Sequence, residues 1–404
     1  MNAVSKVSAE SSKKFTKSLS QPDPIPEAGV ERAVALMHSG RLFRYGEWGG
    51  EVSEAGLLEQ DLADYLNVPY VCAVNSGGSA LFLALKAVGV QAGEPVLVNS
   101  FTLAPVPSAI THAGATPVFV DITEDYVIDT DDLRHRAAES GARVLLLSYM
   151  RGHVPDLDEV LAVCHELELT LIEDCAHTLG ATWRSQHLGT LGAAGCYSAQ
   201  TFKHLNSGEG GFVACRDEAI AAKVILMSGS YMLFGQNGAR PPEAVFEHFQ
   251  AETPNFSMRM SALAAAVVRP QLELLEARAQ SWNSIYDTIA ERLRPVRGLR
   301  LPRRQENAYY VPSSLQFSLN GSTEQLATFQ HRCHERGVAL KWFGDAQPRG
   351  FTSTYRHWQY AGDEELRCSD AVLQSLFDMR LPLHLEKDDC ELIADIIAEA
   401  AVDL

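Results

Sequence analysis

The sequence predicts an α/β protein with a mostly parallel central sheet. Short apolar runs, typical of buried strands, alternate along the chain with longer segments that have helical periodicity. This alternation is typical of parallel strands joined by crossover helices. A second observation is the end of one run, where residues 170–172 are followed at once by Glu173 and Asp174, as at a strand end on the rim of a sheet. Towards the C-terminus, the pattern indicates a smaller α+β unit.

Composition narrows the class of protein. The chain has 404 residues, so two packed units are expected. Its hydrophobic content of 46% is ordinary for a globular protein, and no apolar run is long enough for a membrane span. The net charge of -17 argues against nucleic acid and anionic membranes as partners. Eight scattered cysteines without metal-site spacing favour reduced thiols in a cytoplasmic protein, with no metal site.

Each element is expected from its local pattern. Residues 1–24 are rich in Ser and Lys and lack periodicity, which predicts a flexible arm. Apolar runs predict strands over residues 70–74, 95–99, 116–121, 144–148, 168–174, 195–198, 212–215 and 338–342, and an alternating pattern predicts one over 309–319. Helical spacing predicts helices over residues 30–37, 56–66, 80–88, 129–139, 219–227, 261–293 and 323–336, with further helices ending near 113 and 167.

Two regions are less regular. Residues 228–249 have little periodicity, and a loop of that length inside a compact protein is usually functional or disordered. Segments 372–379, 381–385 and 388–401 are expected to complete the smaller unit. The domain prediction is an arm over residues 1–24, a large α/β domain over 25–275, and a linker helix with a small α+β domain over 276–404.

The turn at residues 75–79 is a candidate anion site. It has the sequence N-S-G-G-S and joins a predicted strand to a predicted helix. Backbone N–H groups and the helix dipole meet at such a turn, where Gly77 and Gly78 are available and Ser79 or Ser76 can add a hydroxyl. From these residues alone, a serine-capped helix after a tight turn remains an equally good interpretation.

The stretch from 171 to 211 carries a candidate reaction centre. Asp174 stands at a strand end, and Lys203 follows Ser198 by five residues, before the glycine-rich segment G-E-G-G at 208–211. A carboxylate and a lysine are two groups that pyridoxal phosphate requires, the first for its pyridinium nitrogen and the second for covalent attachment. Individually, the two residues could be a helix cap and a surface charge.

The complete pattern is more specific. The segments E-D-C-A-H, G-T-L-G and C-Y-S-A-Q-T-F-K-H-L-N-S-G-E-G-G closely resemble the core of the DegT/StrS-type sugar aminotransferases. These are fold type I pyridoxal-phosphate enzymes, so the resemblance implies a mostly parallel seven-stranded-type sheet between helices and a smaller α+β C-terminal domain. It also implies that His177 lies beside the ring 3-oxygen, and that Ser198 and the Gly77–Ser79 turn hold the phosphate.

Some positions depart from the family pattern. The turn reads S-G-G-S-A-L, where the family has S-G-T. Leu103 aligns with the aromatic residue that stacks on the pyridine ring, so an aliphatic contact replaces the stack or Phe101 moves in. The family's Asn that reaches the neighbouring subunit's cofactor phosphate aligns with Ser257, and Asn255 is the alternative. The resemblance therefore implies a homodimer with shared active sites.

These observations predict a pyridoxal-phosphate aminotransferase. It is expected to move an amino group from glutamate or glutamine to a ketone on a sugar-like or polyol-like acceptor, in a biosynthetic pathway. Lys203 would move the proton during transfer. The alternatives are a pyridoxal-phosphate lyase or dehydratase acting on an amino acid, and a non-catalytic regulator. The expected substrate contacts are Arg44, Arg151, Glu209 and Arg349.

Overall fold

The computed structural model describes residues 13–46, 49–362 and 364–402. Its centre is a seven-stranded sheet, in which β9 alone runs antiparallel to both of its neighbours. This confirms the predicted mostly parallel α/β fold. In spatial order the strands are β1 (Tyr70–Val74), β9 (Gly211–Cys215), β8 (Ala194–Ser198), β5 (Thr170–Asp174), β4 (Val144–Ser148), β2 (Pro95–Asn99) and β3 (Thr116–Val120).

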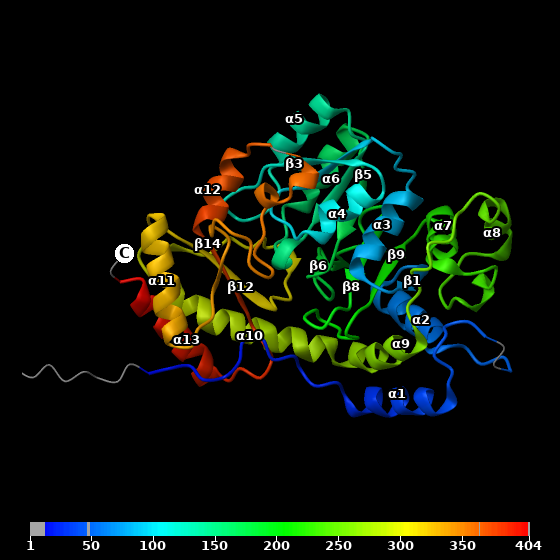
Figure 1. Cartoon of the computed structure of the whole chain (residues 1–404), viewed down its shortest axis with the longest axis horizontal. Helices are drawn as coiled ribbons and strands as arrows, with labels where there is room; N and C mark the ends of the chain where they lie inside the picture. The colour runs from blue at the N-terminus through cyan, green and yellow to red at the C-terminus, as the bar shows by residue number, and fades with distance from the viewer. Residues whose placement is uncertain (1–12, 47–48, 363, 403–404) are drawn as a thin grey trace, which may run out of the picture.

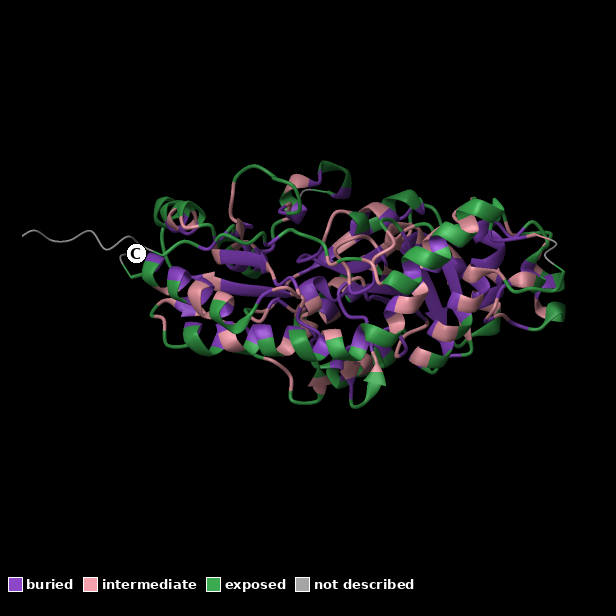
Figure 2. Ribbon diagram, turned by 90° about the horizontal axis from the view of Figure 1, so that it is seen from below, coloured by how far each residue is buried: buried purple, intermediate pink, exposed green. Residues whose placement is uncertain are grey.

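Both faces of this sheet are buried. Along β4, Leu145 and Leu147 belong to one hydrophobic cluster, whereas Val144 and Leu146 belong to the other. Figure 2 shows buried strands between helices whose outer sides are exposed. This explains why the strands are continuous apolar runs without alternation. The helices of this part are α1 (Glu27–Ser39), α2 (Glu54–Leu66), α3 (Gly77–Ala87), α4 (Pro105–His112), α5 (Thr130–Ser140), α6 (Leu157–Glu166), α7 (Glu218–Gly229), α8 (Glu243–Phe249) and α9 (Ala262–Val268).

A second, antiparallel sheet of four strands forms the C-terminal part. Its order is β10 (Leu299–Arg300), β12 (Ser314–Leu319), β14 (Leu376–Arg380) and β13 (Lys341–Trp342). The helices around it are α10 (Leu275–Leu293), α11 (Thr323–Glu335), α12 (Arg367–Ser375) and α13 (Lys387–Ala400). A small third sheet joins β11 (Ala308–Tyr309), β6 (Thr182–Trp183) and β7 (Gln186–His187).

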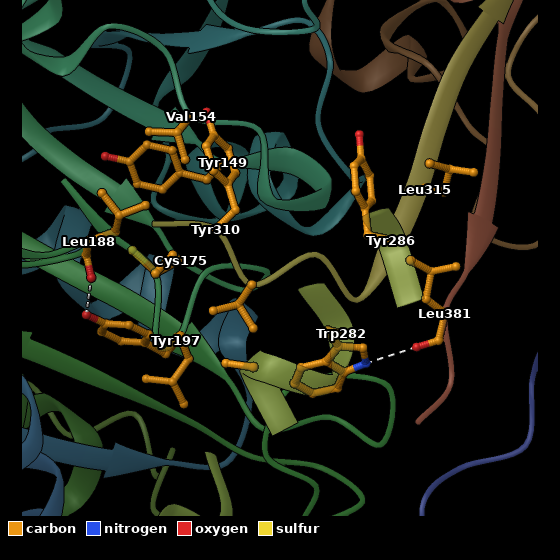
Figure 3. Packing of buried hydrophobic residues seen from close by; sticks show 14 of the residues in the cluster. Tyr149, Val154, Cys175, Leu188, Tyr197, Trp282, Tyr286, Tyr310, Leu315 and Leu381 are labelled. Carbon is orange, nitrogen blue, oxygen red and sulfur yellow. Dashed lines mark hydrogen bonds between the residues drawn. The ribbon is translucent and has the colours of Figure 1, made fainter. Parts of the chain in front are cut away.

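The long helix α10 connects the two main sheets (Figure 1). Trp282 of α10 donates an indole N–H to the carbonyl of Leu381, at 2.9 Å, immediately after β14 (Figure 3). One hydrophobic cluster includes Leu145 of the large sheet and Phe317 of the small sheet. The two sheets therefore share a core, and the end of β14 is held beside the large sheet. The division into domains at residue 275 stays a prediction.

The structure corrects the predicted N-terminal arm. Residues 1–12 of the expected flexible segment lie outside the described residues. From residue 13 onward, however, the segment packs on the C-terminal part: Phe15 and Leu19 are buried, and the backbone N–H of Phe15 donates to the carbonyl of Arg336. Two apolar side chains in a Ser- and Lys-rich stretch are enough to anchor it, and a periodicity search does not detect them.

Three further expectations differ from the structure. Residues 228–249 are not one irregular loop, because α7 reaches Gly229 and α8 follows at Glu243. The segment 372–379 is divided between α12 and β14. Residues 381–385 form no regular element. The run at 372–379 is compatible with both a helix and a strand, and packing decides between them. Among the described helices, none combines the length and apolar character needed to cross a membrane.

Candidate active site

Most of the predicted site residues border one cavity of about 450 Å³. It lies at the carboxyl ends of β4, β5 and β8, which is the edge where open α/β sheets bind ligands. Phe351 and Arg380, from the C-terminal part, line it as well. The predicted residues on its wall are Gly77, Gly78, Leu103, Arg151, Asp174, His177, Ser198, Lys203 and Glu209.

Asp174 ends β5 with its carboxylate held in place by two donors. The hydroxyl of Ser148 donates to Oδ2 at 2.7 Å, and the backbone N–H of Ala176 donates to Oδ1 at 3.2 Å. Thr102 in turn donates its hydroxyl to that of Ser148 at 2.8 Å. Burial raises the pKa of Asp174, and the hydrogen bonds and Lys203 act in the opposite direction. A cationic ring nitrogen is the kind of partner that would favour its charged form.

Lys203 faces the same cavity. Its Nζ lies 2.9 Å from Nε2 of His177. Although the side chain keeps part of its surface open, protein surrounds the amine, and this burial, followed by the charge of Arg151, lowers the pKa of Lys203 to about 7. Burial and Lys203 also hold the pKa of His177 well below its usual value. A neutral imidazole therefore stands beside an amine that is partly deprotonated near neutral pH.

The turn before α3 builds the opposite end of the cavity. The backbone passes so close to β8 that a Cβ on Gly77 would lie 2.8 Å from Cβ of Ser198. A Cβ on Gly211 would lie 2.6 Å from the backbone of Ser76. Only glycine allows this approach, which brings the N-terminus of α3 and the side chain of Ser198 to one place. Helix N-termini of this kind bind phosphate.

Ser79 differs from its predicted place. It does not line the cavity; instead its hydroxyl donates to Oδ1 of Asn75 at 2.6 Å. The hydroxyl of Ser76 borders the cavity and accepts the backbone N–H of Ser79 at 3.0 Å. The helix cap and the candidate anion site, which the sequence left as alternatives, therefore occupy the same turn.

The structure also separates Leu103 from Phe101. Leu103 lines the cavity and is partly exposed to it. Phe101 is buried elsewhere, with its ring centroid 5.3 Å from that of Phe343. Of the two residues considered for the ring contact, only Leu103 is in position. The corresponding ring face would thus meet an aliphatic side chain.

Arg44 lies outside the cavity, contrary to its expected substrate contact. Its side chain is fully buried, and Nη2 lies 2.8 Å from Oε2 of Glu59, which is also fully buried. Nη1 donates to the carbonyl of Ala73. The guanidinium is therefore committed to an internal ion pair next to β1, and it presents no group to a ligand in this chain.

The other predicted residues outside the cavity lie on the surface. Arg349 is exposed and pairs with Asp345 at 3.1 Å, beside a neighbouring hollow of about 760 Å³ that shares Phe202, Phe351 and Arg380 with the first cavity. Ser257 and Asn255 are exposed neighbours: the backbone N–H of Ser257 donates to Oδ1 of Asn255 at 2.9 Å. Their segment runs beside β1, where the backbone N–H of Asn75 donates to the carbonyl of Met258.

Several wall residues were not predicted. Ser148 could have been inferred, because it ends a strand parallel to β5 and lies directly beside Asp174 in register. Arg380 had no comparable signal, since it comes from a segment more than 140 residues beyond Lys203. The complete additional set is Leu81, Ala104, Pro105, Val106, Ser148, Met150, Ala176, Cys196, Tyr197, Gln200, Phe202, Gly350, Phe351, Ser353 and Arg380.

Glu173, the other acid at the end of β5, has a structural role, because its carboxylate accepts four hydrogen bonds from the protein. It is fully buried, and its Oε2 accepts the backbone N–H groups of Leu191 at 2.9 Å and Gly192 at 2.7 Å. Its Oε1 accepts the N–H of Gly189 at 2.8 Å and the hydroxyl of Tyr149 at 2.9 Å. Glu173 thus ties the G-T-L-G segment to the sheet directly behind Asp174.

The residues around the cavity fit pyridoxal phosphate. The close glycine turn and helix N-terminus provide a phosphate cradle, as the contacts of Gly77 with Ser198 indicate. At the other end, a buried carboxylate and a lysine of lowered pKa line the same wall. These are the anion site, the partner for the ring nitrogen and the attachment point that this cofactor requires.

Comparison with known proteins finds related sequences that match part of this chain. MosB of Rhizobium meliloti is 30% identical over 271 residues, which cover 65% of this chain and 54% of that protein. An L-glutamine:2-deoxy-scyllo-inosose aminotransferase of Streptomyces fradiae is 32% identical over 254 residues, which cover 63% of this chain and 60% of that protein. The chain thus spans less than two thirds of the length of either relative.

The fold is shared with solved structures. Spr1654 of Streptococcus pneumoniae, in its PLP-form, superposes with a TM-score of 0.78 at 20% sequence identity, covering 94% of this chain and 97% of that one. At this identity the likeness shows the fold. The model of the DegT/DnrJ/EryC1/StrS aminotransferase family matches residues 31–398, which is nearly the whole sequence. The chain therefore belongs to the DegT/DnrJ/EryC1/StrS aminotransferase family.

Proposed function

We propose that this protein is a pyridoxal-phosphate aminotransferase that moves an amino group from glutamate or glutamine to a ketone of a sugar-like or polyol-like acceptor, in a biosynthetic pathway. The observation that carries the proposal is the meeting of Lys203 and Asp174 on one cavity wall, with the pKa of Lys203 lowered to about 7. The family, and a fold neighbour solved in its PLP-form, support the choice of cofactor.

Each residue has a role that follows from its position. When bound, pyridoxal phosphate supplies an electron sink for the carbanion chemistry of amino transfer. Lys203 would hold it covalently, and Asp174 would keep its ring nitrogen protonated, because a carboxylate partner favours the charged form. Ser198 and the Gly77–Gly78 turn would hold its phosphate. Leu103 would contact the ring face.

Lys203 also provides the proton transfer that the reaction needs. Since its pKa is about 7, a large fraction of the amine is neutral at neutral pH and can accept a proton from substrate carbon. His177, whose imidazole is neutral, lies at hydrogen-bond distance from Nζ and would orient the amine. A group with a pKa near the working pH can both accept and return a proton, as amino transfer requires.

The relatives support the substrate class. The name of the Streptomyces fradiae relative gives L-glutamine as its donor and a cyclic polyol ketone as its acceptor. We propose the same classes of donor and acceptor for the present chain, without naming an individual acceptor. Arg151 and Glu209, which border the cavity, are the substrate contacts retained from the sequence predictions.

A half-reaction tests the proposed activity. Protein reconstituted with pyridoxal phosphate is mixed with L-glutamate or L-glutamine, without acceptor, and both the absorbance and the keto-acid product are measured. We expect one equivalent of keto acid and complete conversion of the cofactor to its pyridoxamine form. Lys203→Ala protein is the control and should release none. Continuous release of ammonia with unchanged cofactor would instead indicate a lyase or dehydratase.

The proposed assembly is a homodimer with shared active sites. Asn255 and Ser257 are exposed and lie outside their own chain's cavity, so a phosphate contact from this segment would require a second copy. Large exposed apolar side chains accompany this surface: Phe43, Tyr231, Met232 and Leu233. The guanidinium of Arg259 lies over the rings of Phe43 and Tyr231, at 5.6 and 5.0 Å. A two-fold interface would cover this apolar surface.

A cytoplasmic location is part of the proposal. All eight cysteines are free, and seven of them are buried. Burial raises the pKa values of Cys175 and Cys196 well above the usual thiol value, so these thiols are unreactive. Reduced structural cysteines of this kind are typical of cytoplasmic proteins.

A further inference from the structure

Arg380 ends β14 and borders the same cavity as Lys203. Its guanidinium carbon lies 3.4 Å from the ring centroid of Phe202 and 5.3 Å from that of Phe351. Within the described parts of the chain, no carboxylate lies within ion-pair distance of the Arg380 guanidinium and no group accepts a hydrogen bond from this side chain. The aromatic contacts therefore position the guanidinium and leave its N–H groups without acceptors.

The neighbouring cations already share the available carboxylate. Asp378 is fully buried, and its Oδ2 lies 2.8 Å from Nη2 of Arg151 and 2.9 Å from Nζ of Lys341. Its Oδ1 accepts the amide of Gln316 at 2.7 Å. With Arg380, this group contains three cations and one carboxylate. The group thus has two fewer negative than positive charges, and two of its cations, Arg151 and Arg380, line the cavity.

A second observation points to the same deficit. Nε of Arg151 is buried and has no hydrogen-bond partner. A buried unpaired N–H is costly, and natural structures usually satisfy it with a ligand or with water. The backbone of Arg151 also has a positive φ of 57°, which places this bulky residue in a sparsely populated conformation. Such strain is common at ligand sites.

We propose that Arg380 is a substrate-binding residue that pairs with a carboxylate of the substrate, with Arg151 behind it as the second cation. The inference rests on the proposed function, because it places the carboxylate on a molecule that reacts beside Lys203. A guanidinium edge matches two carboxylate oxygens, which a lysine does not. Burial, followed by Arg151, lowers the pKa of Arg380 to about 10, so a bound anion would relieve an existing repulsion.

The carboxylate can come from either substrate. An amino donor such as glutamate carries one beside its reacting amine, and a keto acceptor derived from a sugar acid carries one on its ring. In both cases the shared chemistry is a carboxylate within reach of Arg380 while the reacting atom faces Lys203. Phe202, which adjoins Lys203 and stacks on Arg380, keeps the two groups on one wall.

The first experiment measures binding without reaction. Glutarate, which has two carboxylates and no amine, and its neutral diamide are titrated into pyridoxal-phosphate-loaded protein by calorimetry. We expect glutarate to bind and its diamide not to bind. Arg380→Gln should weaken the affinity for glutarate about 10- to 100-fold, as for loss of a charged hydrogen-bonding partner. Arg380→Lys should retain part of the affinity. Arg303→Gln, an exposed arginine paired with Asp125, is the matched control and should bind normally.

The second experiment identifies the source of the carboxylate. KM and kcat are measured for L-glutamate, for a neutral keto-cyclitol and for a keto sugar acid. A raised KM of Arg380→Gln for glutamate assigns the carboxylate to the donor. A raised KM for the keto sugar acid, with the cyclitol unchanged, assigns it to the acceptor. Unchanged KM values for all three, or equal glutarate affinity in Arg380→Gln and wild type, would overturn the inference.

The outcome is separable from that of the proposed function. If glutarate binding depends on Arg380 but glutamate does not convert the cofactor, the carboxylate site stands and the proposed aminotransferase activity is wrong. If amino transfer occurs and Arg380→Gln changes neither glutarate binding nor KM, the activity stands and the carboxylate site is wrong. Thermal melting of each variant shows that a loss of binding does not come from unfolding.

Discussion

At the residue scale, the charge state of Lys203 results from opposing neighbours. Burial lowers its pKa, and the nearby cations Arg151, Arg380 and Lys341 lower it further, whereas Asp174 raises it. The result is a pKa of about 7 in place of the usual 10.5. At a pH between these two values, the buried amine of Lys203 is mostly neutral, whereas an ordinary lysine stays charged. The same environment therefore supplies both a nucleophile and a base.

This environment predicts a pH dependence for Lys203. In protein without cofactor, acylation of Lys203 should rise as the pH passes through about 7, because only the neutral amine reacts. Competitive labelling, read by mass spectrometry, gives the midpoint. Asp174→Asn should lower the midpoint and Arg380→Gln should raise it, since the first removes an attractive charge and the second a repulsive one. A midpoint near the ordinary lysine value would contradict the assignment.

Borohydride reduction provides a separate check on Lys203. In protein loaded with pyridoxal phosphate, reduction followed by peptide mapping should label Lys203, because its amine is partly neutral and faces the cavity. Lys203→Ala should remain unlabelled in the same assay. A stable label on another lysine would move the attachment site.

The Asp174→Asn substitution removes the negative charge of the side chain but keeps its size, so it tests the role of the charge alone. The amide keeps an oxygen for the N–H of Ala176, and its NH₂ can donate to the hydroxyl of Ser148, so the fold should be retained. Turnover should fall roughly 100- to 1,000-fold, the range for loss of a positioned electrostatic group. Steady-state rates and thermal melting measure the two effects. Normal turnover would show that the carboxylate serves only as a local cap.

At the scale of elements, Glu59 joins α2 to three other segments. Its Oε1 accepts the backbone N–H of Ala73 in β1 at 2.8 Å, and its Oε2 accepts that of Gly238 at 2.9 Å. The buried guanidinium of Arg44 supplies the opposite charge. This carboxylate thus holds together β1, the loop before α8 and the segment after α1. Glu59 therefore helps to fix the position of β1, the strand that leads into the turn at residues 75–79.

Glu59→Ala should be strongly destabilising. Removing one partner of a buried ion pair leaves an uncompensated charge on Arg44, at a cost of about 3–5 kcal/mol in the free energy of unfolding. Glu54→Ala, on the same helix, is the matched control. Glu54 keeps part of its side chain exposed and pairs with Arg32 and Arg269, which are both more exposed than Arg44, so the cost is smaller, about 0–1 kcal/mol. Denaturant unfolding measures both, and equal effects would show that the Glu59 network is not a structural anchor.

At the scale of the whole molecule, the proposed shared site makes activity depend on two chains. Mixing Lys203→Ala chains with chains altered at both Asn255 and Ser257 should restore activity. One of the two sites in a mixed dimer then has an intact lysine wall and an intact partner segment. Each variant alone is the control and should be weakly active at most. Activity in a species that sediments as a monomer would exclude the shared site.

The sequence predicted much of the large sheet because its strands are local signals. Residues 70–74, 95–99 and 144–148 are apolar runs bounded by polar or glycine-rich segments, and the strands form at these positions. Where a run was short or mixed, as in 372–379, packing divided it between a helix and a strand. Local sequence determines the tendency of a segment, and long-range contacts decide between similar tendencies.

The sequence by itself assigned Asp174 and Lys203 to one site, because Asp174 ends an apolar run and the spacing of Ser198, Lys203 and the G-E-G-G segment resembles the family pattern. The parallel pairing of β5 with β8 then places the two residues at one sheet edge. Only the tertiary structure decided the use of the arginines. Arg44, expected at the substrate, is neutralised inside the core by Glu59, whereas Arg380 reaches the cavity because α10 and β14 pack against the large sheet. The physical reason is desolvation: an arginine's role depends on which carboxylate folding brings to it, and residue spacing along the chain does not record that partner.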